Sequence, residues 1–328
     1  MGKQRIAFDI GESSVKMIHV SGKEIRNAAV AELPDNMVEN GRILSSDAMA
    51  DFIRENMKAG NLPKAEAAVI LPASLVFVRS ITVPLMTAQQ LEFNLPYEFK
   101  DYLREEKSKY LFDYAVSEII RDEENGDGSM RIFACTTLKE TVEEYRMMFK
   151  RAGLKLKLAI PEECAYMNLV RHAAEKLDKD CCFADIGQHA TRLHLFHAGE
   201  YSTKRSIEIG LGQLDAIIAD RHQVDIHMAH TYKENNYNHV LTEGDALAFY
   251  NNLAVEMTKA LNFFNYNNRD AELKDIYLCG GGAEIEPLVN IIRDTTHMEV
   301  HSAQELMPKK NDMQANLFLQ GYGLAIGE

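Results

Sequence analysis

Two stretches of the chain, FDIGESSVKMIHV at 8–20 and FADIGQHATRLHLF at 183–196, repeat one pattern that suits phosphate and metal chemistry. In each, an aspartate and a glycine two residues apart precede a hydroxyl-bearing residue and an apolar strand that contains a histidine. An aspartate at the end of a strand can meet magnesium through water, because this ion keeps much of its hydration shell. The glycine lets the backbone approach a phosphate, whose oxygens bind turn N–H groups and hydroxyls.

The repeat predicts two strand–turn–strand hairpins that clamp a polyphosphate from both sides. One half alone does not enclose the anion, whereas a duplicated pair does. We expect Asp9 and Asp185 to hold magnesium and to place the attacking water if hydrolysis occurs. The residues expected to bind phosphate are Gly11, Ser13, Ser14, Lys16, Gly187 and Thr191. Either hairpin alone is weak evidence, since aspartate and glycine often end strands together in ordinary turns.

A third element strengthens this interpretation. The segment DIYLCGGGAE at 275–284 is a predicted strand that opens into Gly280, Gly281 and Gly282. A loop of three glycines admits close approach of its backbone to a flat or phosphorylated ligand. Its spacing matches neither the dinucleotide-binding fingerprint nor the Walker loop.

The elements that must position these residues follow from apolar spacing and turn residues. Strands are expected at 5–10, 15–20, 66–71, 75–83 and 274–279, and helices at 138–154, within 211–233 and within 242–266. Residues 84–155 differ in character from their surroundings and predict a small α/β insertion. The acidic run at 123–128 within it predicts a solvated hairpin tip, since its spacing is not that of a calcium loop.

Composition narrows the class of protein. At 328 residues the chain is long enough for two cores. A net charge of −13 argues against a general nucleic-acid binder. No apolar run approaches the ~20 residues of a membrane helix, and the N-terminus lacks the core of a signal peptide. The five cysteines lie mostly in apolar runs, as expected of reduced residues in a cytoplasmic protein.

Taken in order, these motifs resemble the actin-like ATPase superfamily, which includes actin, heat-shock chaperone ATPases, sugar kinases and FtsA. The two hairpins resemble its phosphate loops, and LCGGGAEIEPL resembles its adenosine loop. IPEECAYMNLV at 160–170 and QGYGLAIG resemble its two connecting helices, which implies a catalytic role for Glu162. Glu256 and Lys259 are similar in position to a Glu-x-x-Lys pair that flanks adenosine in the chaperones. An ordinary solvated ion pair is the alternative for these two residues.

Over nearly the whole chain the resemblance is to the PilM family, cytoplasmic actin-like proteins of type IV pilus assembly. It implies an α/β, actin-like (ribonuclease H-like) duplicated two-domain fold with an inserted FtsA-type 1C subdomain. Domain 1A is expected at 1–83, 156–180 and 315–328, the 1C-type subdomain at 84–155, and domain 2 at 181–314, with 2B at about 206–273. A C-terminal membrane helix like that of FtsA is not expected.

The resemblance implies an ATP- and Mg²⁺-binding adaptor of a type IV pilus, or related type II secretion, inner-membrane platform. Its partner is then the N-terminal cytoplasmic peptide of a PilN-like membrane protein, which holds the adaptor at the inner face of the membrane. We expect the peptide groove between the domain of the first hairpin and the insertion, near Leu85, Met86, Leu91, Phe93 and Leu95, unless these residues only pack the helix of the insertion. An FtsA/MreB-like polymerising ATPase and a small-molecule kinase of the same superfamily are the alternatives.

Two departures from the superfamily pattern make nucleotide binding a firmer expectation than hydrolysis, which is at most slow. Gln188 and His189 stand where second phosphate loops usually carry small residues. In the first connecting helix Glu162-Glu163 replaces Glu-Pro, and we favour Glu162 as the residue that faces the metal.

Overall fold

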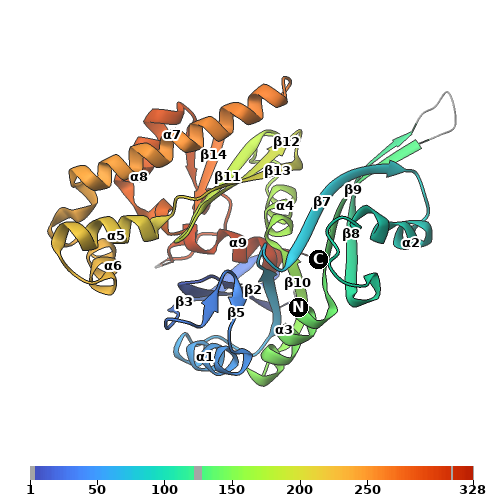
Figure 1. Cartoon of the computed structure of the whole chain (residues 1–328), viewed down its shortest axis with the longest axis horizontal. Coiled ribbons are helices and arrows are strands. Elements are labelled where there is room, and N and C mark those ends of the chain that lie inside the picture. Colours follow the sequence, from blue (N-terminus) through green and yellow to red (C-terminus); the bar gives the residue numbers. More distant parts are fainter. Residues whose placement is uncertain (1–3, 122–127, 312, 328) are drawn as a thin grey trace. The chain divides into compact units, whose positions relative to one another are not determined.

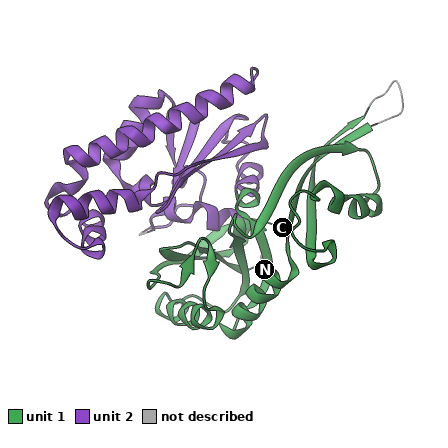
Figure 2. Cartoon of the chain, viewed as in Figure 1, with its two compact units in different colours: residues 1–165, 324–328 green, residues 166–323 purple. Residues whose placement is uncertain are grey.

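The computed structural model describes residues 4–121, 128–311 and 313–327. It divides into two compact units, coloured separately in Figure 2, one of residues 1–165 and 324–328 and the other of residues 166–323. Most of the hairpin tip expected at 123–128 lies outside the described residues. The finer division into 1A, 1C and domain 2 stays a prediction.

The first unit is built on a five-stranded sheet of order β10-β6-β1-β2-β3. Its strands are β1 (Gln4–Ile10), β2 (Ser14–Ser21), β3 (Glu24–Glu32), β6 (Glu66–Leu71) and β10 (Lys155–Pro161). The first three strands form an antiparallel meander, whereas β6 runs parallel to both β1 and β10. The middle of β1, Ile6 to Phe8, and nearly all of β6 are buried and apolar, as is typical of parallel strands covered on both faces.

Helices α1 (Ser46–Ala59) and α3 (Lys139–Arg151) pack together in the core of this sheet. Ser45 caps α1 by accepting the N–H of Ala48, which supplies one of the helix's unpaired N-terminal donors with a partner. A two-stranded hairpin, β4 (Val38–Glu39) with β5 (Arg42–Ile43), precedes α1 (Figure 1). The buried guanidinium of Arg5 donates to the carbonyl of Ala325 at 3.1 Å and so ties the C-terminal residues to β1.

A three-stranded antiparallel sheet of order β7-β9-β8 completes the first unit. Its strands are β7 (Val76–Pro84), β8 (Tyr110–Arg121) and β9 (Gly128–Leu138), with α2 (Ala88–Glu98) against one face. Leu91, Leu95 and Phe99 bury α2 in a separate apolar core with this sheet. Strand β7, which the expected division assigns to 1A, therefore pairs with a strand of the insertion.

The second unit repeats the first sheet strand for strand, with the order β13-β12-β11-β14-β15. Its strands are β11 (Cys181–Ile186), β12 (Thr191–His197), β13 (Glu200–Ile207), β14 (Asp275–Cys279) and β15 (Glu299–Ser302). Again three antiparallel strands are followed by two that run parallel to the first. The duplication predicted from the sequence is therefore confirmed.

The helices of the second unit are α5 (Leu211–His222), α6 (Ile226–Glu234), α7 (Gly244–Asn267), α8 (Glu286–Thr296) and most of α9 (Ala315–Ile326). Helix α4 (Glu162–His172) begins in the first unit and ends in the second. The long helix α7 buries Leu253, Met257 and Leu261 against the sheet. Within the described ranges, no helix is long and apolar enough to span a bilayer.

Candidate functional site

The first candidate loop is the turn between β1 and β2. Asp9 pairs with Lys16 across the hairpin, and the Gly11 N–H donates to the Ser14 carbonyl at 2.9 Å. A Cβ on Gly11 would lie 3.2 Å from that carbonyl oxygen, so a side chain would crowd the turn. Ser13 is exposed, and its carbonyl accepts the Leu33 N–H at 2.8 Å. The loop therefore presents the Ser13 hydroxyl beside a turn that one backbone hydrogen bond closes.

Lys16 points toward Asp9, with 3.3 Å between Nζ and Oδ2. Both side chains are largely buried, at 21% and 16% exposure. The lysine compensates a carboxylate that would otherwise lie partly desolvated without a counter-charge. A magnesium ion bound by Asp9 would share the carboxylate with Lys16 or free the ammonium group for a phosphate.

The second candidate loop, between β11 and β12, has the same construction. Asp185 pairs with Arg192, and the Gly187 N–H donates to the Ala190 carbonyl at 3.1 Å. A Cβ on Gly187 would lie 3.2 Å from that oxygen, the same distance as in the first loop. The repeat in the sequence is therefore a repeated turn, with an aspartate at the same position in the pairing of the two strands.

The three glycines after β14 lie directly against this second loop. A Cβ on Gly280 would collide with the Asp185 carboxylate, and one on Gly282 with the Ile186 side chain. Gly280 also adopts φ +79° and ψ −178°, a conformation that essentially only glycine tolerates. The structure thus brings together Asp185 and the predicted adenosine loop, which lie about ninety residues apart in the chain.

Asn316, which the sequence reasoning missed, holds the glycine loop from the start of α9. Its backbone carbonyl accepts the Gly280 N–H at 3.0 Å, and its side-chain amide donates to Glu284 at 3.0 Å. Its side-chain oxygen accepts from the Ala303 N–H at 3.0 Å. Nothing in the local sequence around Asn316 signals these contacts.

The first turn of α5 is hydrogen-bonded to the backbone of the second loop. The N–H groups of Leu211 and Gly212 donate to the carbonyls of Gly187 and Gln188 at 2.9 and 2.7 Å. A Cβ on Gly210 would lie only 2.5 Å from the Gln188 carbonyl oxygen. The donors at this helix end are thus used to fix the loop, whereas in many proteins such donors bind anions.

A buried polar network continues from the second loop into α5 and α6. The Gln188 amide donates to Asp215 at 2.8 Å, and Asp215 forms an ion pair with Lys233 at 2.8 Å. Asp215 and Lys233 are only 1% and 3% exposed, and His230 lies 3.2 Å from the same carboxylate. Burial acts to raise the pKa of Asp215, but His230 and Lys233 outweigh it and lower that pKa below its usual value.

Gln188 therefore points into its own unit and anchors the loop. Thr191 is also used internally, since its hydroxyl donates to the Ile209 carbonyl at 2.9 Å and the residue is fully buried. In this conformation its side chain presents no surface to a phosphate. His189 is exposed.

Glu256 and Lys259 form the expected i,i+3 pair, with 2.6 Å between Oε1 and Nζ, and are 37% and 66% exposed. They line an open cavity of about 570 Å³ between β13 and α7 that also includes Arg205 and Phe263. Neither Asp185 nor any residue of the glycine loop lines it. Their assignment to adenosine stays a prediction that this placement does not favour.

Glu162 and Glu163 both lie in the first turn of α4 and are both buried, at 7% and 1% exposure. Burial therefore does not separate the two candidates for a catalytic glutamate. Our preference for Glu162 stays a prediction.

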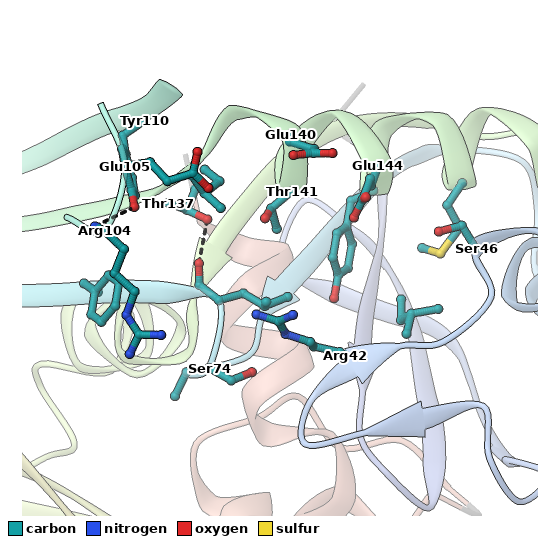
Figure 3. A pocket seen from close by; sticks show the side chains of 17 residues that line it. Arg42, Ser46, Ser74, Arg104, Glu105, Tyr110, Thr137, Glu140, Thr141 and Glu144 are labelled. Carbon is teal, nitrogen blue, oxygen red and sulfur yellow. Dashed lines mark hydrogen bonds between the residues drawn. The ribbon is translucent and has the colours of Figure 1, made fainter. Parts of the chain in front are cut away.

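The first unit contains a cavity of about 700 Å³ where the β4–β5 hairpin, the β6–β7 turn and α3 meet the small sheet (Figure 3). Its polar lining carries both signs of charge, from Arg42, Arg104, Glu105, Glu140 and Glu144. Apolar side chains complete it, namely Ile43, Leu75, Phe77, Leu138 and Met148. The Thr137 hydroxyl donates to the Leu75 carbonyl at 2.6 Å and braces one wall.

This cavity lies where elements of the first sheet meet the insertion, as expected of the groove, but its lining residues differ from those named. None of the five residues named for that groove lines it. Leu91 and Leu95 are each 1% exposed and pack the core of the small sheet, whereas Phe93 is 69% exposed. For these two leucines the packing alternative is correct.

A family model described as type IV pilus assembly protein PilM matches residues 7–325. The chain is similar to the structure of a PilM–PilN type IV pilus biogenesis complex, with a TM-score of 0.81 and 21% identity over 98% of this chain and 97% of that one. A comparison with curated proteins finds no match.

Two further structures share the fold. Ethanolamine utilization protein EutJ from Carboxydothermus hydrogenoformans has a TM-score of 0.63 and 14% identity, over 99% of this chain and 90% of that one. MreB5 of Spiroplasma citri bound to ADP has a TM-score of 0.51 and 14% identity, over 98% and 94%. The α/β actin-like fold predicted from the sequence is confirmed by these likenesses.

Proposed function

Because the chain belongs to the PilM family of type IV pilus assembly proteins, we propose that it is an ATP-binding adaptor. Its partner is the N-terminal cytoplasmic peptide of a PilN-like membrane protein. Through that peptide it sits at the cytoplasmic face of the inner membrane, within the platform that assembles the pilus.

The repeated Asp-x-Gly turn is the observation that carries the nucleotide half of this proposal. In both loops the glycine N–H is hydrogen-bonded within the turn, at 2.9 and 3.1 Å, beside an aspartate at the end of a buried strand. In the second unit the glycine loop packs on Asp185 so closely that no side chain fits. We propose that these loops bind the phosphates of ATP and that Gly280, Gly281 and Gly282 border the nucleotide.

A magnesium ion fits the oxygen donors of these loops, since it prefers carboxylates and nucleotide phosphates. Asp9 and Asp185 would hold it, and it would neutralise phosphate charge. Ser13, Ser14 and Lys16 would bind phosphate oxygens, while Gly11 and Gly187, whose N–H groups close their own turns, would let the chain approach the phosphates. Turnover is slow or absent in this proposal, because Gln188 is committed to Asp215 and Thr191 to Ile209.

The cavity of the first unit supports the peptide half. Its volume of about 700 Å³ lies in the usual range of ligand sites, about 300–1,000 Å³. Apolar side chains of Ile43, Leu75 and Phe77 would accept apolar residues of an extended peptide, while the arginines and glutamates would fix its register. We therefore propose that the groove between the domain of the first hairpin and the insertion is this cavity, with these lining residues in place of those of α2.

Calorimetry with ATP and magnesium tests the nucleotide half. We expect Asp185→Asn and Asp9→Asn to weaken magnesium-dependent ATP binding at least tenfold, on the order of the loss of one charge-assisted contact. Asp220→Asn, an exposed aspartate of α5, is the control and should bind like the wild type. Unchanged ATP affinity in both loop variants would contradict the assignment.

Two neighbouring glutamates of α3 test the peptide half. Both are exposed, but Glu144 lines the cavity, whereas Glu143 pairs with Arg146 and does not line it. Glu144→Lys should weaken binding of the PilN-type peptide at least fivefold, and Glu143→Lys should not. Equal effects would contradict the assignment of the groove to this cavity, and no binding by the wild type at high micromolar peptide would contradict the adaptor function. Pelleting of the protein with ATP would instead favour a polymerising role.

A further inference from the structure

One side chain of the first phosphate loop reaches away from the proposed nucleotide and toward the peptide cavity. The Glu12 carboxylate, next to Gly11 in the β1–β2 turn, accepts the backbone N–H of Gly41 at 2.9 Å. These two residues lie 29 positions apart in the chain and belong to the same unit. A carboxylate that accepts an N–H forms a charge-assisted hydrogen bond, about twice as strong as a neutral one.

Gly41 occupies a position where its neighbours leave it little freedom. It follows Asn40 in the two-residue turn between β4 and β5, and both have positive φ, +50° and +74°. Asn-Gly with this conformation is the favoured tight turn of a hairpin. A Cβ on Gly41 would lie 2.8 Å from the Ser74 hydroxyl and 3.0 Å from Pro72, so its backbone rests on the β6–β7 turn.

The residues that flank this contact form part of the cavity wall. Arg42 and Ile43 follow Gly41 directly, and Ser74 is the residue on which Gly41 rests. Figure 3 shows Arg42 and Ser74 among the side chains that line the cavity. A displacement of Glu12 would therefore act on the hairpin and on the β6–β7 turn together.

We propose that Glu12 is a positioning residue that couples occupancy of the first phosphate loop to the shape of the peptide cavity. Phosphate binding orders the loop, the loop fixes Glu12, and Glu12 holds the β4–β5 hairpin in the conformation that receives the peptide. Ordering by one ligand lowers the entropy that the second ligand must lose, which gives positive cooperativity. This inference rests on the proposed function, because it requires that both ligands bind.

Calorimetric titration of the full chain with the PilN-type N-terminal peptide, with and without a non-hydrolysable ATP analogue and magnesium, measures the coupling. For the wild type we expect the analogue to tighten peptide binding about 5- to 20-fold, within the usual span of allosteric coupling. The peptide should tighten binding of the analogue by the same factor, because coupling is reciprocal.

Three substitutions of Glu12 distinguish the effect of its hydrogen bond to Gly41 from the effect of its negative charge. Glu12→Ala removes the acceptor and should reduce the coupling to less than twofold. Glu12→Asp keeps the charge but shortens the side chain by one methylene, so it should also lose most of the coupling. Glu12→Gln keeps an acceptor oxygen at the same reach and should retain part of it. Glu39→Ala, an exposed glutamate of the same hairpin, is the control and should couple like the wild type.

The outcomes are distinguishable. If the wild type binds both ligands with no mutual effect, or if Glu12→Ala keeps the full coupling, the inference is wrong and the proposed function stands. If the wild type fails to bind either ligand, the proposed function is wrong and the inference falls with it. Thermal unfolding of each variant shows whether a loss of coupling results from a loss of the folded state. If Glu12→Ala does not fold, the coupling in Glu12→Gln tests the inference.

Discussion

The buried ion pair between Asp215 and Lys233 yields the sharpest energetic prediction. Lys233→Met keeps the apolar stem of the side chain and removes its charge, which leaves the 1%-exposed carboxylate of Asp215 without its cation. Removing one partner of a buried pair typically costs about 3–5 kcal/mol. Gln188 and His230 still hydrogen-bond this carboxylate, at 2.8 and 3.2 Å, so we expect the lower end, about 3 kcal/mol.

Urea unfolding followed by far-ultraviolet circular dichroism measures this loss, since the chain contains no tryptophan for fluorescence. The matched control is Lys259→Met, which removes a lysine that is 66% exposed in its pair with Glu256. An exposed pair contributes about 0–1 kcal/mol, so the control should unfold almost like the wild type.

A double variant checks the cause. Asp215→Leu combined with Lys233→Met removes both charges and should recover much of the lost stability, because apolar replacement of a whole buried pair is often neutral or better. A loss below about 1 kcal/mol in Lys233→Met, or an equal loss in Lys259→Met, would refute the reasoning.

Three further predictions concern the second unit. Gly280→Ala should destabilise the second unit by about 1–3 kcal/mol and weaken ATP binding, because the added Cβ strains the backbone and collides with the Asp185 carboxylate. The control is Gly199→Ala, at φ +82° with open space around it, which should bind ATP normally in calorimetry. Tyr250→Phe should raise the free energy of unfolding by about 1 kcal/mol, since the buried Tyr250 hydroxyl has no hydrogen-bond partner among the described residues. Urea unfolding measures this change, and a lowered midpoint would contradict it. The hydrogen bond to Asp215 raises the pKa of His230 above its ordinary value. The stability that protonated His230 contributes is therefore full below about pH 6.5, and it declines as pH rises through the higher pKa of the folded state. The difference in melting temperature between wild type and His230→Gln should therefore shrink from pH 6 to pH 8, and a constant difference would exclude this linkage.

Much of the fold follows from local patterns. The two Asp-x-Gly turns were predictable because a strand alternates its faces and a glycine ends it, which depends only on neighbouring residues. Most predicted strands begin and end within one or two residues of those observed, as with 66–71 and β6. The helix spacing that predicted a Glu256–Lys259 pair was also correct, since residues three apart on a helix are neighbours.

What that pair faces was not predictable from spacing. It depends on which stripe of α7 packs on the sheet, and Leu253, Met257 and Leu261 decide this by turning inward. In the same way, Leu91 and Leu95 do not line the expected groove, because they close the core of the small sheet. An apolar stripe indicates that a helix buries one face, but not whether the chain itself or a partner covers it.

By itself the amino-acid sequence determined the duplicated architecture, the two loops and the glycine-rich element, because each is encoded by residues adjacent in the chain. Only the tertiary structure decided that Gln188 turns inward to Asp215, that Asn316 holds the glycine loop and that Glu12 reaches Gly41. These contacts join segments from 27 to 36 residues apart, whose approach is set by the packing of whole strands and helices. Hydrogen bonds over such separations leave no periodic signal in sequence, since they form between single groups and only after the surrounding elements have packed.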